Sequence, residues 1–256
     1  MKIFGIIPAR MNSSRFFGKP LKLIKGKPML EHVFERAKIY RKWDKLVIAT
    51  CDKEIKQFSQ LKGYEYVMTS KKHERCLDRV FEASNKMDKK LSNNDLVVCV
   101  QGDEPMLHPT MIEAVINPLL RNKKIKATVL AVQIIHFSQF INPNIVKIVH
   151  DVEGRVLFTS RSPIPYTKKF SRNMNAKRIG GIFAFKYFFL KKYFNLKPSP
   201  LEINESCDIN RICDNGGGVY VAPIKYKPYF AVDTPSDLRL VNKSMAKDLL
   251  WKKYKF

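Results

Sequence analysis

Residues 1–28 read MKIFGIIPARMNSSRFFGKPLKLIKGKP and combine a strand pattern, a cationic loop and the start of a helical pattern. The apolar run 3–7 is typical of a buried strand, and Pro8 ends it. The loop that follows contains Arg10, Arg15 and Lys19, which match no apolar period. Cations and backbone amides between a strand and a helix suit a polyphosphate. This stretch therefore predicts an α/β fold and an enzyme that acts on a nucleoside triphosphate.

Apolar runs alternate with helical patterns through the first half of the chain. The strand patterns cover 3–7, 45–50, 64–69 and 95–100. The helical patterns cover 28–40, 53–62, 76–89 and 109–120. This order predicts a doubly wound, mainly parallel sheet, because each parallel strand needs a helical crossover to reach the next. Ligands bind at the carboxyl edge of such sheets, where we expect the loops 8–20, 50–52, 70–76 and 101–108.

The second half of the chain is less regular. Its strand patterns are 128–133, 146–149, 156–160 and 181–185, and its helical patterns are 187–193, 208–214 and 234–250. No linker, internal repeat or low-complexity segment separates it from the first half. We therefore expect a mixed-sheet extension and a single domain over 1–256.

The composition is that of a globular protein without a membrane anchor. Of the 256 residues, 45% are hydrophobic and 11% are aromatic. No apolar run reaches the roughly 18 residues that a membrane span needs, and the N-terminus lacks the plan of a signal peptide. The five cysteines show no CxxC spacing, which favours reduced thiols over a disulfide or zinc framework. We expect a cytoplasmic protein with no membrane insertion.

The formal net charge of +24 could indicate a nucleic-acid-binding protein. The lysines are spread along the chain in short clusters, however, and no cluster alternates with aromatic residues. Such charge usually lies on a solvated surface. The sequence therefore disfavours nucleic acid as a partner, and the charge would instead help to attract an anionic substrate.

Two carboxylates follow apolar runs. Asp103 lies in QGDEP at 101–105, directly after the strand pattern 95–100, and Asp233 follows the apolar stretch 230–232. Carboxylates that leave strands beside a triphosphate loop can hold Mg²⁺ while the metal bridges phosphate oxygens. Two other roles stay open. Asp103 could bond only the backbone of a strand-end turn, and Asp233 could cap the helix that follows it.

These features, with others along the chain, resemble the 3-deoxy-manno-octulosonate (Kdo) cytidylyltransferases. The matching motifs are IPAR at 7–10, SSR at 13–15, GKPL at 18–21, GKPM at 26–29, VQGDEPM at 100–106, NPN at 142–144, VK at 146–147, Asp151 with Glu153-Gly154, SRSPIP at 160–165, PSPLE at 198–202 and VDTP at 232–235. The resemblance spans nearly the whole chain in order and with similar spacing. The N-terminal loop alone indicates a broad group of sugar nucleotidyltransferases, whereas the full set is much more specific.

The resemblance implies an α/β nucleotidyltransferase fold, a homodimer and dependence on Mg²⁺. The implied reaction joins a sugar acid to CMP from CTP and releases pyrophosphate, for the synthesis of surface glycans such as lipopolysaccharide or capsule. The implied catalytic residues are Arg10, Lys19 and Asp103, and the implied metal ligands are Asp103 and Asp233. The implied substrate- or nucleotide-binding residues are Pro8, Ala9, Arg15, Arg75, Gln101, Arg161, Arg178 and Arg211. Within these sets, Arg10, Arg15 and Lys19 would hold the triphosphate, and Gln101 and Arg161 would lie on the sugar side.

The chain departs from the family pattern at base- and sugar-recognition positions. A His-x-Ser-Gly-Thr-Glu-Arg run appears here as HERCLDR at 73–79, so that Arg75 and Leu77 replace small residues near the base. Two polar sugar-side positions appear as Ile179 and Ile209. The changes at 75 and 77 leave the choice of base open. Sites built to bond hydroxyls discriminate strongly, and we expect the sugar-side changes to favour an acid related to Kdo over Kdo itself. The guanidinium groups at 161, 178 and 211 could still bind a carboxylate or phosphate.

Three functional hypotheses follow. The leading one is a Mg²⁺-dependent cytidylyltransferase for Kdo or a related sugar acid. The alternatives are a nucleotidyltransferase for a different anionic or phosphorylated acceptor, and a nucleotide-binding homologue without catalysis. The presence of Arg10, Lys19, Asp103 and Asp233 argues against the last of these.

Overall fold

A sheet of nine strands forms the centre of the computed structural model, which describes residues 1–88, 90–224 and 231–255. The strands are β1 (Ile3–Pro8), β4 (Lys45–Thr50), β5 (Tyr66–Met68), β6 (Leu96–Val100), β7 (Ala127–Gln133), β8 (Lys147–His150), β9 (Val156–Ser160), β10 (Lys177–Lys186) and β11 (Tyr220–Ile224). Seven of them run in the order β11-β7-β10-β6-β1-β4-β5, and β8 joins β10 to β9 at one side. A separate two-stranded hairpin consists of β2 (Leu23–Ile24) and β3 (Lys27–Pro28).

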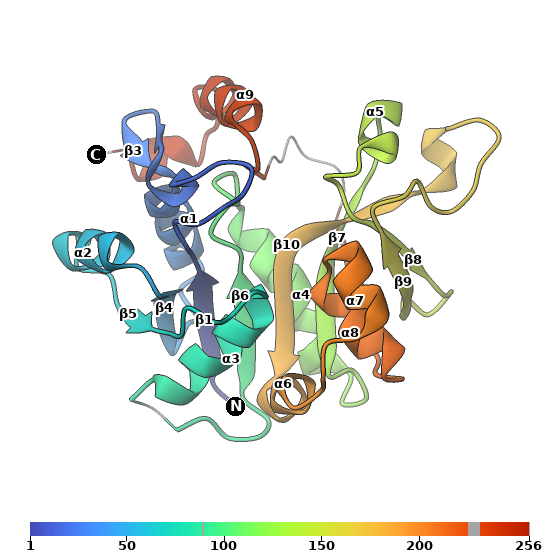
Figure 1. Ribbon diagram of the computed structural model, residues 1–256, viewed down its shortest axis with the longest axis horizontal. Helices are drawn as coiled ribbons and strands as arrows, with labels where there is room; N and C mark the ends of the chain where they lie inside the picture. Colours follow the sequence, from blue (N-terminus) through green and yellow to red (C-terminus); the bar gives the residue numbers. More distant parts are fainter. Residues whose placement is uncertain (89, 225–230, 256) are drawn as a thin grey trace.

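In the part of the chain that the structure describes, six of the seven strands in this order run in the same direction. β1 pairs in parallel with both β4 and β6, β4 with β5, and β7 with β11. β10 is the exception, because it runs antiparallel to both β6 and β7. The hairpin of β8 and β9 pairs with the start of β10 and extends beyond the main sheet (Figure 1). The predicted fold, a mainly parallel sheet with a mixed-sheet extension, is therefore confirmed, whereas the single domain stays our interpretation.

Helices cover both faces of this sheet. They are α1 (Met29–Lys38), α2 (Lys53–Lys62), α3 (Cys76–Lys86), α4 (Pro109–Arg121), α5 (Phe137–Ile141), α6 (Tyr187–Phe194), α7 (Pro200–Glu205), α8 (Asp208–Asp214) and α9 (Pro235–Met245), with short 3₁₀ turns η1 (Lys19–Leu21), η2 (Arg172–Met174) and η3 (Trp251–Lys253). The apolar sides of α1, α2, α4 and α9 pack on one face. Those of α3, α6 and α8 pack on the other, which faces the viewer in Figure 1. Two buried cores thus lie on either side of one sheet, as a doubly wound fold requires.

The apolar runs form strands because both of their faces are buried. In β1, Phe4 and Ile6 contact one core and Ile7 contacts the other. All five residues of β6 are buried, which is typical of a central parallel strand. Burial on both faces removes the apolar–polar alternation and leaves the continuous runs seen in the sequence.

The structure differs from the predicted elements mainly in the second half. β10 begins at Lys177 and not at residue 181, and α5, α7 and β11 were not predicted. The last helix ends at Met245, before the predicted 250, and Asp248 beyond its end pairs with Arg36. The expected strand before Asp233 is also wrong for 231–232, which are irregular, while residue 230 lies outside the described residues. Within the described ranges, no helix is long and apolar enough to cross a bilayer.

The C-terminal segment is tied to α1 by buried polar groups. The Nε of Arg36 donates to the hydroxyl of Tyr254 at 2.6 Å, and that hydroxyl lies 2.9 Å from Nδ1 of His32. The other ring nitrogen of His32 lies 2.7 Å from the carbonyl oxygen of Ile24. Since Tyr254 can donate to Nδ1 while Nε2–H donates to the carbonyl, the neutral imidazole satisfies every partner. Burial, assisted by the nearby Arg36, lowers the pKa of His32 to about 4.

This histidine is expected to make the fold sensitive to acid. Its pKa in the folded protein lies below the ordinary value of 6.5, so protonation favours the unfolded chain. The stabilisation is complete above pH 6.5 and is lost as the pH falls towards 4, by about 3 kcal/mol. Urea unfolding at pH 7, 5.5 and 4 should show the wild type losing about that much more stability than His32→Gln, which keeps a donor but does not titrate. Parallel pH profiles for the two proteins would contradict the assignment.

Candidate active site

A cleft of about 600 Å³ opens at the carboxyl edge of the sheet. The N-terminal loop, the start of α3, the segment after β6 and residues 231–237 line one side of it. The segment 142–146, Arg161, the start of β10 and residues 206–208 line the other. The predicted site residues found in this lining are Pro8, Ala9, Arg10, Arg15, Lys19, Arg75, Gln101, Asp103, Arg161, Arg178 and Asp233. The predicted loop 50–52 does not reach the lining, but Asp52 accepts a hydrogen bond from the backbone of Met11 and supports the N-terminal loop.

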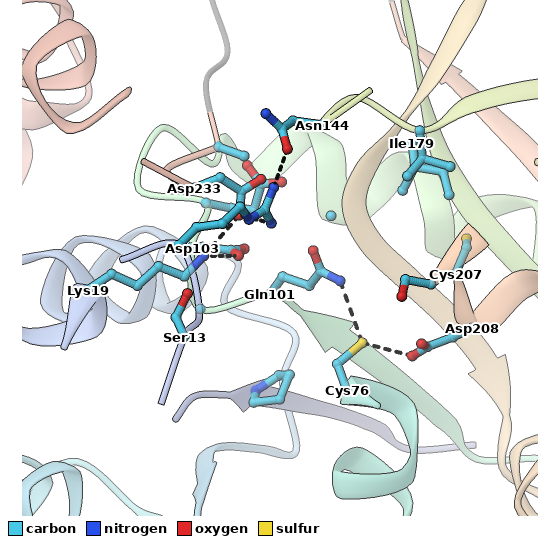
Figure 2. A pocket seen from close by; sticks show the side chains of 18 of the residues that line it. Ser13, Lys19, Cys76, Gln101, Asp103, Asn144, Ile179, Cys207, Asp208 and Asp233 are labelled. Carbon is cyan, nitrogen blue, oxygen red and sulfur yellow. Dashed lines mark hydrogen bonds and ion pairs between the residues drawn. The ribbon is translucent and has the colours of Figure 1, made fainter. Parts of the chain in front are cut away.

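Lys19 lies between the two carboxylates of the cleft. Its Nζ is 2.8 Å from Oδ2 of Asp103 and 3.1 Å from Oδ1 of Asp233, and it donates to the carbonyl of Val232 at 2.9 Å. The backbone amide of Val232 donates to the carbonyl of Asp103 at 2.9 Å, which brings the two acidic segments together. Burial opposes the charge of Lys19, but the two carboxylates outweigh it and raise its pKa. Figure 2 shows the three side chains converging at one end of the cleft.

The two acidic side chains fit a hard divalent cation. Oδ1 of Asp103 is buried and accepts no hydrogen bond from the residues that the structure describes. Asp233 does not cap α9, since Thr234 and Asp237 form the capping box and leave its carboxylate to the cleft. No group of three or more acidic, histidine or cysteine ligands occurs among the described residues. Two carboxylates with phosphate oxygens and water are the usual ligand set of Mg²⁺, so the donors present suit that ion.

The remaining cations of the N-terminal loop differ in their contacts. Arg15 bridges the cleft, donating to Oδ1 of Asn144 at 2.6 Å and to Oδ1 of Asp233 at 2.9 Å. Arg10 is exposed and makes no hydrogen bond or ion pair with any described residue. Its guanidinium is therefore available to an anion. The sequence did not predict Asn144 as a site residue, because its contact with Arg15 spans 129 positions and leaves no local signal.

A row of hydrogen bonds crosses the floor of the cleft. Nε2 of Gln101 donates to Sγ of Cys76 at 3.5 Å, and that thiol donates to Oδ2 of Asp208 at 3.1 Å (Figure 2). Asp208 also accepts from the backbone of Leu77 at the start of α3, and burial raises its pKa. The backbone of Gln101 is also held in place, because its backbone N–H donates to the carbonyl of Gly181 at 2.9 Å. Sequence reasoning placed Gln101 but missed the thiol and the carboxylate that orient it.

Gly181 lies against the side chain of Glu104. Its φ is +36°, and a Cβ at this position would lie 2.1 Å from Oε1 of Glu104. The register of β10 against β7 shifts between Ile179 and Phe183, around the same glycine. The shift bends the strand at the cleft, as glycine-containing bulges commonly do beside functional sites.

Arg161 and Arg178 also line the cleft. Two backbone carbonyls hold the guanidinium of Arg161. Its Nε donates to the carbonyl of Glu205 at 2.8 Å, and its Nη1 donates to the carbonyl of Pro143 at 2.9 Å. Arg178 is 93% buried, and Ile179 lies beside it in the lining. The planar guanidinium groups of these two residues suit the geometry of a carboxylate.

Arg75 lines the cleft but its guanidinium contacts Glu202. Its Nη2 donates to the carbonyl of Glu202 at 3.2 Å, and its Nε lies 3.6 Å from Oε1 of the same residue. The neighbouring Leu77 is completely buried in the core and does not line the cleft. The expected change near the base therefore concerns Arg75 and Cys76, and Leu77 takes no part in it.

Two sequence expectations are corrected by the structure. Arg211 does not line the cleft: its guanidinium is 3% exposed, pairs with Glu202 at 2.7 Å and with Asp78 at 2.9 Å, and lies over the ring of Tyr193. Ile209 is completely buried in the core beneath α8 and does not line the cleft either. In both cases α8 turns the side chain away from the cleft, and buried groups of other elements contact it. Ile179 is thus the one of the two altered sugar-side positions that faces the cleft.

Arg211 is therefore expected to matter for stability and not for substrate binding. Its removal leaves Glu202, which is 0% exposed, without its bidentate partner. Arg211→Met should lower the free energy of unfolding by about 3 kcal/mol, because breaking a buried pair from one side strands the other charge. Urea titration measures this loss. Arg239→Met, which replaces an exposed arginine outside the cleft, is the control and should unfold like the wild type. An unchanged stability with a raised substrate KM would return Arg211 to the binding site.

The fold and the cleft together define a class of protein. It is an α/β protein whose cationic loop and acidic pair, at the carboxyl edge of the sheet, are arranged to bind a nucleoside triphosphate. A cytidylyltransferase family model matches residues 4–221. The chain belongs to the cytidylyltransferase family.

Individual relatives agree with this assignment. A 3-deoxy-manno-octulosonate cytidylyltransferase of Thermodesulfovibrio yellowstonii is 38% identical over 248 residues, which cover 94% of this chain and 96% of the relative. The enzyme of the same name from Haemophilus influenzae is 36% identical and covers 97% of this chain and 100% of the relative. A solved structure of CMP:2-keto-3-deoxy-manno-octonic acid synthetase complexed with CTP matches with a TM-score of 0.86 and 32% identity, over 97% of this chain and 100% of the other.

Proposed function

We propose that this protein transfers CMP from CTP to Kdo and releases pyrophosphate. The observation that carries the proposal is the convergence of Arg15 and Lys19 on the carboxylates of Asp103 and Asp233, with the exposed Arg10 in the same lining. Full-length similarity to enzymes named for Kdo supports the acceptor, and the relative solved with CTP supports the nucleotide.

The cleft has the groups that this reaction needs. A hydroxyl of the sugar acid attacks the α-phosphorus of CTP, forming a new P–O bond; the bond to pyrophosphate breaks in line, and the hydroxyl loses its proton. Negative charge grows on the leaving oxygens, and Arg10, Arg15 and Lys19 stabilise it. Arg161 and Arg178 bind the carboxylate of the acceptor at the opposite side. Gln101 lies between the two ends, and its carboxamide is oriented by Cys76.

Mg²⁺ is the metal that we propose for this site, with Asp103 and Asp233 as its protein ligands. When bound, the ion lowers the pKa of the attacking hydroxyl and neutralises phosphate charge. The buried, unbonded Oδ1 of Asp103 supports the proposal. The homodimer implied by the family and the cytoplasmic location stay predictions, and light scattering of the purified chain tests the first.

A related sugar acid is the second candidate acceptor. Ile179 places an apolar side chain in the lining where the family pattern has a polar one, which favours a less polar substituent nearby. The other altered position, Ile209, lies in the core. One of the two sequence reasons for expecting an unusual acceptor is therefore removed by the structure.

Pyrophosphate release in the presence of Mg²⁺ tests the proposal. CTP, UTP, GTP and ATP are each combined with Kdo, its amino analogue, other sugar acids and sugar phosphates. We expect release with CTP and Kdo above all other pairs. Selective release with CTP and another sugar acid would establish the second candidate, and release with no pair would contradict a catalytic role.

A further inference from the structure

Lys147 is a buried ammonium whose donors are all used by cleft-lining segments. The residue is 0% exposed at the start of β8. Its Nζ donates to the carbonyl oxygens of Asn142 at 2.8 Å, Ile145 at 2.8 Å and Arg161 at 2.5 Å. A lysine ammonium has three N–H donors, so its capacity is filled by these backbone groups.

The three acceptors belong to two segments that form one wall of the cleft. Asn142, Ile145 and Arg161 all line the cleft. Between the first two lies Asn144, which is labelled in Figure 2 and whose Oδ1 accepts a hydrogen bond from Arg15 at 2.6 Å. Arg161 follows β9 at its end, and β9 pairs with β8 next to Lys147. One ammonium thus joins the loop before β8 to the guanidinium-bearing residue after β9.

The groups around Lys147 bring its pKa into a range where it can lose a proton, and with it one of its three N–H donors. Burial, together with the charge of Arg161, lowers its pKa to about 8, while Glu205 on α7 opposes this shift. Arg178, its cross-strand neighbour on β10, adds a second positive charge nearby. A neutral amine has only two N–H donors. Its lone pair would then face one of the three carbonyl oxygens, and that contact would become repulsive.

We propose that Lys147 is a positioning residue for the acceptor side of the cleft, in which its ammonium holds Arg161 and the loop 142–145 in the geometry that binds the sugar acid. It touches no substrate and acts through the three carbonyls. The inference rests on the proposed function, because the effect is measured on the binding of Kdo. It requires three donors at this position and therefore a charged lysine.

The test measures KM and kcat with CTP and Kdo from pH 7 to 9.5. In the wild type, KM for Kdo should rise as the pH passes 8, while KM for CTP changes less than threefold. Lys147→Gln retains two donors and does not titrate, so its KM for Kdo should already be about tenfold higher at pH 7 and flat up to pH 9.5. Circular dichroism at each pH checks that both proteins stay folded.

Lys177→Gln is the matched control. Lys177 is also buried, and burial also lowers its pKa, but its Nζ contacts His150 and Asn175, which lie outside the cleft lining. This variant should keep the wild-type profile. A profile that is flat in the wild type, or a Lys147→Gln profile that still rises above pH 8, overturns the inference.

The outcomes separate this inference from the proposed function. If the wild type turns over CTP and Kdo but shows no rise in KM, the function stands and the role of Lys147 is wrong. If the wild type does not use Kdo, the proposed function fails first and the inference fails with it. If Lys147→Gln does not fold, the wild-type and Lys177→Gln profiles still decide the question.

Discussion

Asp103→Asn is expected to lower kcat for pyrophosphate release by about 10³-fold. The substitution removes the negative charge of a proposed Mg²⁺ ligand, and the bound cation would stabilise the transition state. The carboxylate of Asp103 forms an ion pair with Lys19 through Oδ2, and its Oδ1 is buried without a hydrogen bond from the described residues. An amide is nearly isosteric but neutral, so it can neither attract a divalent cation nor pair with Lys19. Steady-state pyrophosphate release with CTP and Kdo at saturating Mg²⁺ measures the loss.

The control for this variant is the same change at an exposed carboxylate. Asp88→Asn alters a side chain that is 94% exposed and lies outside the cleft lining, and it should keep wild-type kcat. The melting temperature of Asp103→Asn should fall only modestly, because Lys19 loses its ion pair with Oδ2 but keeps Asp233 and the carbonyl of Val232 as partners. Retention of more than a tenth of the wild-type kcat by Asp103→Asn would exclude Asp103 as a metal ligand in catalysis.

Lys19→Met is expected to have two opposite effects. Catalysis should fall by about 10³-fold in kcat/KM, because Lys19 is one of the cations available to the triphosphate. The nucleotide-free protein, in contrast, should bind Mn²⁺ about tenfold more tightly. In the free protein Lys19 neutralises Asp103 and Asp233, so a cation must displace its ammonium from both carboxylates before it can bind there.

The second effect is measured without nucleotide or turnover. Titration of free Mn²⁺ by electron paramagnetic resonance gives the affinity of wild type and variant directly. Lys22→Met removes an exposed lysine of the same segment and should leave that affinity unchanged. Equal or weaker Mn²⁺ binding by Lys19→Met would show that the ammonium does not compete with the cation, even if activity is lost.

Much of the first half of the fold could be predicted because its signals are local. Residues 3–7 and 96–100 are apolar without interruption, since burial on both faces of a parallel sheet demands it. The second half was harder for a physical reason. β10 is a long antiparallel strand between two others, and its glycine-containing bulge divides the apolar run that would have revealed its full length.

The candidate site shows the same division. Arg10, Lys19 and Asp103 could be picked from the sequence because charged residues at strand ends interrupt an apolar pattern. The contacts that position Arg15 and Gln101 could not. The contact between Arg15 and Asn144 joins residues 129 positions apart, and that between Cys76 and Asp208 joins residues 132 apart. No local pattern encodes such pairs.

The order of strands and helices and the set of charged loop residues are readable from the chain alone, because periodicity and strand-end position depend only on near neighbours. The orientation of the arginines is not. Arg178 and Arg211 look equally able to bind an anion in the sequence, yet one lines the cleft and the other is enclosed by Glu202 and Asp78. That outcome depends on which elements pack beside each residue: β10 runs along the cleft, whereas α7 brings a buried carboxylate to α8, and a buried guanidinium pairs with the carboxylate that lies nearest.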